Sequence, residues 1–427
     1  MPESAADPSV PPSTTYDAVT CPFCALLCDD LVVTSSAGRL SAGDNACPKA
    51  RASFARPVPA ATPLVDGKPT SYALAVAAAV KRLKKSRQPL IAGLGTDVDG
   101  VRAALLLAER CGAILDHRHG RALLNNLRVL QSRGQATTTL GEVRNRADLV
   151  VLVGASIDED FHGFARRCLR PADALLPERL ARRQILHLGP AAKLPRQPGV
   201  DAQSLPCRDE ELLEILNAVR ALRAGRSTRL KARRLQLVTT LVERIAAAEY
   251  AVFVWAPGQL GVDGDLVIGA LCDLIADLNR TQRAAGLALG GNDGGQSALA
   301  TAAWHTGYPL QLSYAGATIE YDPLRFDTAR LLADGAVDLL LWISSFNPVL
   351  APASDAPLVV LGLPGTPLRA TGEDGNAIFL PVGTPGLDHA GRLMRTDGVV
   401  ALPLAQLRAL GLPSAAKVLA DLAEGMV

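Results

Sequence analysis

The feature that most constrains the fold is an alternation of short apolar runs with amphipathic stretches, which starts near residue 71. Runs of strand length occupy residues 89–93, 113–116, 148–154, 184–188, 250–255, 337–344 and 357–362, and helical periodicity occupies 71–85, 98–111, 209–224, 230–248 and 266–278. Strands separated by helices can pair in parallel, because the helix carries the chain back along the sheet. With 427 residues, enough for two or three domains, we expect an α/β protein with two or more parallel-sheet lobes.

The remaining segments differ in composition and suggest the domain borders. Residues 1–19 are rich in proline, serine and alanine without apolar periodicity, which predicts a disordered tail, and residues 20–65 predict a compact Cys-rich lobe. We expect one α/β lobe made of residues 66–118 and 320–427, and a second α/β lobe made of residues 119–319. Ligands of such sheets bind at the carboxyl ends of the strands, so the loops to consider begin at Gly93, His117, Gly154, Trp255 and Ser344.

Charge and composition exclude several classes of protein. The 44 Lys and Arg residues nearly balance the 42 Asp and Glu residues, and only 4% of residues are aromatic, so the chain lacks the positive field and stacking surface of a nucleic-acid-binding protein. No apolar run approaches the roughly 20 residues needed to cross a bilayer, and no cationic segment leads into an apolar one at the N-terminus. We therefore expect a cytoplasmic protein that binds neither nucleic acid nor membrane.

Four of the eight cysteines crowd near the N-terminus, and they are the strongest chemical signal in the sequence. Cys21, Cys24 and Cys28 lie on one tight loop, and Cys47 follows a predicted hairpin over residues 31–40. Three thiolates on one loop with a fourth further along can wrap a four-iron, four-sulfur (4Fe-4S) cluster. A zinc ion is one alternative, although zinc is more often held by two Cys-x2-Cys pairs or with histidine, and cysteines without metal are another. The other four cysteines are interpreted as small buried hydrophobic residues.

Two glycine-rich loops and several histidines are weaker candidates for a binding site. Residues 93–100 follow a strand and precede a helix, but their glycine spacing is not that of a dinucleotide-binding loop. Residues 290–295 could let the backbone approach a ligand closely, or they could form a plain surface loop; the candidate cofactor-binding residues there are Gly290, Gly291, Asn292 and Asp293. Four histidines lack metal-binding spacing, and a structural role is expected for each: His117, His119, His162 and His305.

Several strings along the chain carry a resemblance, and those at 139–148 and 304–309 are too long for a chance match. The strings are CPFCALLCDD at 21–30, the His-Gly pair at 119–120, TLGEVRNRAD at 139–148, WHTGYP at 304–309, and LDHAG and MRTDG within 387–398. Together they resemble the B subunit of formylmethanofuran dehydrogenase, a member of the molybdopterin oxidoreductase superfamily, over roughly residues 20–412. The resemblance implies a molybdopterin-oxidoreductase-like α/β fold with a small N-terminal lobe of iron-sulfur type.

The resemblance breaks at the position of the metal ligand. In the redox enzymes of this family, a cysteine or selenocysteine directly before the His-Gly pair binds tungsten or molybdenum, which also carries two pterin dithiolenes. Here that residue is Arg118, and a guanidinium only donates hydrogen bonds and stays protonated, so it cannot act as a thiolate ligand. An arginine expected upstream of the glycine loop is replaced by Leu287, Ala288 and Leu289. The resemblance therefore implies a degenerate site at Arg118 and His119 that lacks the tungsten or molybdenum pterin.

This pattern is most similar to the bacterial relatives in which the B subunit is part of a formyltransferase/hydrolase complex. The likeness implies a redox-inactive scaffold subunit in tetrahydromethanopterin-linked one-carbon metabolism, where formaldehyde is oxidised to formate. The implied partners are an A-type hydrolase, a D-type formyltransferase and a C-type chain of the same complex, and these partners hold a methanofuran-like carrier. One alternative is an active tungsten or molybdenum enzyme that interconverts carbon dioxide and formate. Another is a metal-free formyl- or pterin-binding protein that acts alone.

Overall fold

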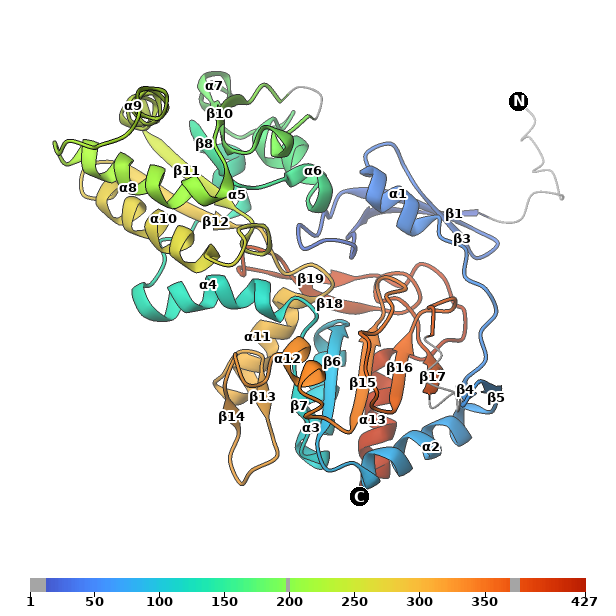
Figure 1. Ribbon diagram of the computed structural model, residues 1–427. Coiled ribbons are helices and arrows are strands. Elements are labelled where there is room, and N and C mark those ends of the chain that lie inside the picture. Colours follow the sequence, from blue (N-terminus) through green and yellow to red (C-terminus); the bar gives the residue numbers. More distant parts are fainter. Residues whose placement is uncertain (1–12, 197–199, 369–376) are drawn as a thin grey trace, which may run out of the picture. The chain divides into compact units, whose positions relative to one another are not determined.

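The computed structural model describes residues 13–196, 200–368 and 377–427, and the chain divides into two compact units. The first unit contains the residues up to Gly120 together with Gly291–Val427, and the second contains Arg121–Gly290. In Figure 1 the second unit runs from teal to yellow, and the blue and the orange-to-red segments belong to the first. Each unit is built on its own parallel sheet, which confirms the expected mixed α/β fold. In the described part of the chain, no helix has the length and apolar character needed to cross a membrane.

A nine-stranded sheet forms the centre of the first unit. Its strands are β4 (Leu64–Val65), β5 (Lys68–Pro69), β6 (Pro89–Gly95), β7 (Ile114–Leu115), β13 (Leu312–Ser313), β14 (Glu320–Tyr321), β15 (Leu339–Ser344), β16 (Leu358–Gly362) and β17 (Ala377–Pro381). The spatial order is β14-β13-β7-β6-β15-β16-β17-β4-β5, and the strands from β7 to β17 in this order run parallel. Every residue of β6, β15 and β16 is buried, as expected for parallel strands covered on both faces.

Two of the helices of the first unit, α2 (Tyr72–Lys85) and α3 (Val98–Cys111), were predicted from the sequence, and both form within one residue of the predicted bounds. The other helices are α1 (Pro48–Phe54), α11 (Gly295–Thr306), α12 (Thr328–Ala333) and α13 (Ala415–Gly425). The side chain of Asp97 caps α3 by accepting a hydrogen bond from the Gly100 N–H at 3.0 Å, and Gly112 ends the helix at φ +67°. Helix α2 starts one residue after the predicted position, because Ser71 is its N-cap. The capping residues therefore determine where α2 begins and where α3 begins and ends.

The N-terminal region is more ordered than the sequence analysis expected. Residues 13–19 fall within the predicted disordered tail, but they form strand β1 (Ser13–Val19). This strand pairs antiparallel with β2 (Leu31–Ser36), which also pairs with β3 (Arg39–Ala42). Because β1 is exposed along most of its length, it has no apolar periodicity, and its pairing with β2 is what orders it. The rest of the predicted tail, residues 1–12, lies outside the described residues.

The Cys-bearing segment, predicted as a lobe over residues 20–65, belongs to the first unit and does not form a unit of its own. Leu27 is 2% exposed and packs in an apolar cluster with Phe346, Leu393 and Leu404. The last two lie on β18 (Gly391–Met394) and β19 (Ala401–Leu404), which form an antiparallel pair. A segment this short cannot bury a core of its own, so it shares the core of the larger unit.

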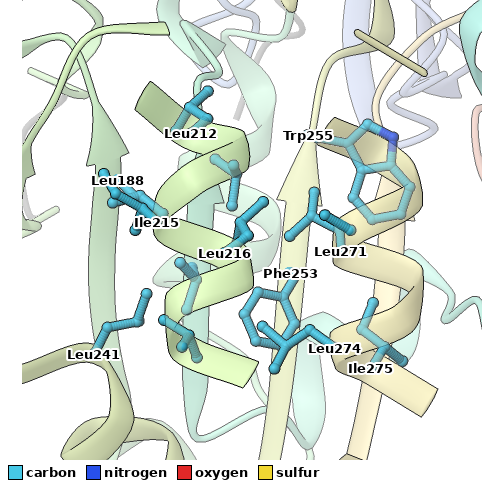
Figure 2. Close-up of a cluster of buried hydrophobic side chains, with 14 of the residues drawn as sticks. Leu188, Leu212, Ile215, Leu216, Leu241, Phe253, Trp255, Leu271, Leu274 and Ile275 are labelled. Atoms are coloured by element: carbon cyan, nitrogen blue, oxygen red, sulfur yellow. The ribbon is translucent and has the colours of Figure 1, made fainter. Parts of the chain in front are cut away.

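The second unit is built on a five-stranded parallel sheet. Its strands are β8 (Leu149–Val153), β9 (Gln184–Gly189), β10 (Gln203–Pro206), β11 (Tyr250–Trp255) and β12 (Arg283–Ala288), in the order β10-β9-β8-β11-β12. Its helices are α4 (Gly120–Arg133), α5 (Leu140–Asn145), α6 (Ile157–Asp160), α7 (Pro177–Arg182), α8 (Leu212–Arg223), α9 (Ala232–Ala247) and α10 (Gly264–Leu278). Figure 2 shows Leu212, Ile215 and Leu216 of α8 and Leu271, Leu274 and Ile275 of α10 gathered with Phe253 of β11 in one apolar core.

The border of the second unit differs from the predicted one. The sequence analysis ended the second lobe at residue 319, whereas the structure ends it at Gly290 and assigns the following residues to the first unit. The physical reason is that β13 pairs with β7, with Leu312 opposite Leu115 and Ser313 opposite Ile114. Pairing between segments almost 200 residues apart leaves no local signal in the sequence.

A buried arginine holds the α5 side of the second unit together. Arg183 is 4% exposed, and burial foremost lowers the pKa of its guanidinium to about 10. Its nitrogens donate to backbone carbonyls at distances between 2.6 and 3.0 Å; the acceptors are those of Val143, Arg144, Ala147, Cys168 and Leu169. One guanidinium thus provides the hydrogen-bond donors that these buried backbone carbonyls need in the absence of water.

We predict that Arg183→Met lowers the free energy of unfolding by about 3 kcal/mol, because it leaves several buried carbonyls without donors. Urea denaturation measures this change. The matched control is Arg182→Met, since the Arg182 side chain is 62% exposed and its ion pair with Glu249 spans 3.8 Å. The control should change stability by less than about 0.5 kcal/mol. Equal effects of the two substitutions would refute the assigned role of Arg183.

Candidate functional site

The nine-stranded sheet has a point at which its strand order reverses. From β6 the chain continues to β7 on one side, whereas β15, β16 and β17 lie on the other side. Open α/β sheets bind ligands at such a point, beyond the carboxyl ends of the two adjacent strands. Here β6 ends at Gly95 and β15 ends at Ser344. The backbone N–H and the hydroxyl of Ser345 each donate to the Gly95 carbonyl at 2.7 Å, which ties the two loops together.

The glycine loop, residues 291–295, lies against this edge of the sheet. Gly294 has φ +76°, and a methyl group on its Cα would overlap the carbonyl oxygen of Thr96, which follows β6. A Cβ on Gly295 would lie 3.0 Å from Cε1 of His117. The small residues therefore allow a close approach that larger side chains would block. In this structure Gly294 lies against the backbone of Thr96, and Gly295 lies against the His117 ring.

The carboxylate of Asp293 is the centre of the site. Its Oδ2 accepts from Arg118 Nη1 at 3.1 Å and from His119 Nε2 at 3.2 Å, and its Oδ1 accepts from Asn347 Nδ2 at 2.7 Å. Burial raises the pKa of Asp293, but the His119 hydrogen bond and the Arg118 charge outweigh it and hold the pKa well below its usual value. Because the Asp293 side chain is 14% exposed, water screens these interactions only weakly. Asp293 is therefore an ionised carboxylate with each oxygen paired to a donor of this chain.

His117 lies buried beneath this carboxylate. Its Nδ1 accepts from the backbone N–H of His119 at 3.0 Å, and its Nε2 lies 3.1 Å from the carbonyl oxygen of Asp293. A carbonyl can only accept, so the proton is on Nε2 and the ring is neutral. Burial foremost, and then the neighbouring His119, lower the pKa of His117 to about 3. Both ring nitrogens are used within the chain, so His117 holds the loops together, in agreement with the structural role expected for it.

These residues do not fit a tungsten or molybdenum centre of the kind that the redox enzymes of the resembled family carry. The side chain at the ligand position, Arg118, donates to Asp293 and has no lone pair for a metal. The oxygens of Asp293 and the nitrogens of His117 are engaged by protein groups. Within the described residues, no group of three or more His, Cys, Asp or Glu side chains is arranged to hold a metal ion.

The four clustered cysteines come together in the first unit. Cys21, Cys24 and Cys28 are buried, and the Cys21 N–H donates to the Cys28 carbonyl at 2.8 Å, so the loop closes on itself. Cys47 is the N-cap of α1, and its Sγ accepts from the N–H of Ala50 at 3.4 Å. Burial, and then the charges of Cys24, Cys28 and Cys47, raise the pKa of Cys21 well above its usual value. Cys21 is therefore buried and lies within electrostatic reach of the other three thiols.

The cysteine loop is hydrogen-bonded to the glycine loop. The Ala25 N–H donates to Asn292 Oδ1 at 2.9 Å, and the Thr396 N–H donates to the Ala25 carbonyl at 2.8 Å. Ala25, Asn292 and Thr396 each belong to a segment that the sequence analysis singled out separately. The structure thus brings the cysteine loop, the glycine loop and the string at 394–398 to one place.

The other residues predicted for the site lie elsewhere or serve the fold. Gly290 is the last residue of the second unit, and His162 is half-buried in that same unit. His305 is exposed on the last turn of α11. Residues 93–100 form the end of β6 and the start of α3, as an ordinary strand-to-helix turn would. The sequence analysis did not identify Asn347 as a residue of the site. The one indication in the sequence is that Asn347 follows the predicted strand that ends at Ser344.

We predict that Asp293→Asn lowers the free energy of unfolding at pH 7 by about 2 kcal/mol, because a charged acceptor of three hydrogen bonds is lost. The folded pKa of Asp293 lies below that of an unfolded Asp, about 3.9. The stabilisation is therefore complete above that value and disappears as the pH falls through the lower folded pKa. Urea denaturation between pH 3 and 8 should show the difference between variant and wild type shrinking in acid.

The control for this prediction is Asp99→Asn. Asp99 is 45% exposed and pairs with Arg102 at 3.7 Å, so its loss should change stability by less than about 0.5 kcal/mol. A difference between Asp293→Asn and wild type that persists unchanged to pH 3 would show that the charge of Asp293 is not the stabilising element.

Comparison with known proteins gives consistent matches over most of the chain. No family model matches the sequence. The chain is 30% identical over 342 residues to the B subunit of the formyltransferase/hydrolase complex Fhc of Methylorubrum extorquens, which covers 79% of this chain and 89% of the relative. The B subunit of tungsten-containing formylmethanofuran dehydrogenase 2 is 26% identical in Methanococcus maripaludis, over 90% of this chain and 92% of the relative. In Methanocaldococcus jannaschii the same protein is 27% identical, over 89% of this chain and 91% of the relative.

A solved structure has the same fold. It is the crystal structure of the formyltransferase/hydrolase complex FhcABCD from Methylorubrum extorquens with methylofuran. One of its chains superposes on this protein with a TM-score of 0.73 and 29% identity, covering 86% of this chain and 98% of that chain. Sequence and fold thus agree over nearly the whole length of the relatives, and the chain belongs to the family of the B subunit of the formyltransferase/hydrolase complex.

Proposed function

We propose that this chain is a redox-inactive scaffold subunit of a formyltransferase/hydrolase complex that takes part in one-carbon metabolism. Its partners would be a hydrolase, a formyltransferase and a third chain, corresponding to the other components of the related FhcABCD complex. A formyl group would pass from tetrahydromethanopterin to a methanofuran-like carrier and then be hydrolysed to formate, with the carrier held by the partner subunits. The whole assembly would be cytoplasmic.

The observation that carries this proposal is the pairing of Arg118 with Asp293. The position that should supply a thiolate to tungsten or molybdenum holds a guanidinium, and the adjacent carboxylate neutralises it. A metal centre would have to displace an ion pair whose side chains are 29% and 14% exposed, and it would gain no protein ligand in return. Without that centre the subunit would lack the group through which the redox enzymes of the family exchange electrons with formate or carbon dioxide. Its contribution to the complex is therefore its shape and its contacts with the catalytic subunits.

The competing function is that of an active tungsten enzyme, as in the two archaeal relatives, whose names state that they contain tungsten. Their identities to this chain, 26% and 27%, are close to the 30% of the bacterial relative, so identity alone does not separate the two functions. The side chains at the crevice separate them, because Arg118, Asp293 and His117 are all engaged with one another or with the backbone.

The test is elemental analysis and activity of the complete complex purified through a tag on this chain. We predict substoichiometric tungsten and molybdenum, co-purification of hydrolase and formyltransferase subunits, and release of formate from a formylated carrier without any added electron acceptor. Arg118→Cys should leave the complex unable to reduce an artificial electron acceptor with formate, since one thiol does not restore the pterin site. Stoichiometric tungsten or molybdenum with bound pterin would overturn the scaffold proposal.

We further propose that Cys21, Cys24, Cys28 and Cys47 hold a 4Fe-4S cluster that serves as a structural staple. Three thiols on one buried loop and a fourth at the start of α1 suit such a cluster. Burial, and then repulsion among the four sulfurs, raise the pKa of Cys21, and bonds to iron would hold its sulfur as a thiolate. Among the described residues no group of three or more His, Cys, Asp or Glu side chains is arranged to hold a metal ion, so the proposal rests on the spacing of the four cysteines and on the electrostatic contact of Cys21 with the other three. Bound here, the cluster would supply cross-links between the cysteine loop and α1.

We predict that the chain purified without oxygen is brown and contains about four irons, and that Cys24→Ser abolishes the iron and lowers the melting temperature. Cys111→Ser is the control, because Cys111 lies at the end of α3, outside the cysteine loop. It should keep the iron of the wild type. Iron-free wild-type protein whose melting temperature equals that of Cys24→Ser would rule out the cluster, and one zinc per chain would replace it with the alternative metal.

A further inference from the structure

The four clustered cysteines lie on two separate elements that the fold has to hold together. Three of them are on the cysteine loop, residues 21–28, and Cys47 is the N-cap of α1. Phe23 of the loop packs edge-on against Phe54 of α1, with ring centroids 5.3 Å apart and ring planes inclined by 89°. This contact joins the loop to the helix. Metal ligands keep their geometry only when further residues fix the elements that carry them, so the contacts of both elements with the rest of the unit matter.

The cysteine loop is held by residues of the crevice. The Ala25 N–H, in the middle of the loop, donates to Asn292 Oδ1 at 2.9 Å. Leu27 has φ +46°, a left-handed conformation that is uncommon outside glycine, and it is buried against Phe346. A strained residue of this kind persists only where its surroundings hold it. Asn292 and Phe346 therefore hold the loop in a conformation that its own sequence does not favour.

Helix α1 is held by the same crevice at its other end. Arg56 follows directly after the helix, and its Nη1 donates to the Phe346 carbonyl at 3.0 Å. Its Nη2 donates to Asn347 Oδ1 at 3.1 Å. The Nδ2 of Asn347 donates in turn to Asp293 Oδ1 at 2.7 Å. The helix that begins at Cys47 is thus tied to the carboxylate at the centre of the crevice.

Arg56 also brings a positive charge without a carboxylate partner. Its guanidinium forms no ion pair among the described residues, and burial lowers its pKa. Arg56 and Phe23 line the same hollow of about 20 Å³, so Arg56 lies next to the cysteine loop. The other two charges at this hollow, Asp388 and Arg408, pair with each other at 2.7 Å. Metal-bound cysteines are thiolates, and negative charges with little access to water need positive charge nearby, which Arg56 can supply.

We propose that Asn292 and Arg56 are positioning residues of the four-cysteine site, which hold its loop and its helix from the side of the Arg118–Asp293 crevice. This inference rests on the proposed cluster for its purpose, since the cysteines would be positioned to bind it. Residues that orient metal ligands without binding the metal commonly change metal affinity about 10- to 100-fold. The glycine loop and Asn347 thus have a use in a subunit that carries no redox metal in its crevice.

The test is the rate at which the complete complex, purified without oxygen through a tag on this chain, loses iron to the chelator bipyridyl. We expect Asn292→Leu and Arg56→Met to release iron roughly 10-fold faster than the wild type. Asn292→Asp keeps an oxygen that accepts from the Ala25 N–H, so its rate should lie closer to that of the wild type. Arg183→Met is the control, because Arg183 belongs to the second unit and its hydrogen bonds do not involve the cysteine loop. It should release iron as the wild type does.

A second measurement follows the thiols without any metal. After removal of iron from the complex, iodoacetamide should label the cysteine loop of Asn292→Leu and Arg56→Met roughly 10-fold faster than that of the wild type. Buried thiols react only when the segment around them opens, and these substitutions remove contacts that keep it closed. Mass spectrometry assigns the label to each peptide. Labelling of Cys168, which is buried in the second unit, should not change.

The outcomes separate this inference from the proposed cluster. If the wild-type complex contains no iron, the cluster fails, and the labelling rates still decide whether Asn292 and Arg56 position the thiols. If iron is present and both variants release it and react with iodoacetamide as the wild type does, only the positioning roles are refuted. Equal acceleration by Arg183→Met would also overturn them, since a general loss of stability would then explain the effect.

Discussion

The packing of the loops at the crevice of the first unit depends on one carboxylate, that of Asp293, whose side chain is 14% exposed. A carboxylate with little access to water must be paired, and Asp293 obtains its donors from two segments: Arg118 and His119 before α4, and Asn347 after β15. The His117 ring donates to the backbone carbonyl of Asp293. These contacts hold the loop in the crevice between β6 and β15. They also engage the oxygens of Asp293 and the nitrogens of His117, which supports the proposal that this subunit carries no tungsten centre.

The comparison with the relatives gives this network a functional meaning. The chain shares its fold with a component of a complex that was solved with methylofuran, and it also resembles proteins whose names state that they contain tungsten. A scaffold with the same backbone can serve either kind of assembly, because the backbone does not determine which side chains face the crevice. Replacing a thiolate with a guanidinium is compatible with the fold only where an acceptor such as Asp293 lies within reach. The structure supplies that acceptor.

Much of the fold could be predicted from the sequence, and the exceptions have a physical cause. The strand at Tyr250–Trp255 and the helix at Val98–Cys111 were predicted within their observed bounds, because fully buried strands and capped helices leave local signals. Strand β1 was predicted as a disordered tail, since an exposed strand has no apolar alternation. The end of the second unit was placed at residue 319 and lies at Gly290, since the pairing of β13 with β7 is decided far along the chain. The clustering of the four cysteines was visible in their spacing, whereas the role of Asn347 was not.

The sequence by itself determined the alternation of buried strands with helices, the four cysteines and the arginine in place of a metal ligand, because each of these is a property of neighbouring residues. Only the tertiary structure decided that Arg118 faces Asp293, that Asn292 joins the cysteine loop, and that Leu27 is buried against Phe346. Hydrogen bonds and burial of this kind link residues that are far apart in sequence. Their geometry is therefore known only once the sheet has brought the ends of its strands together.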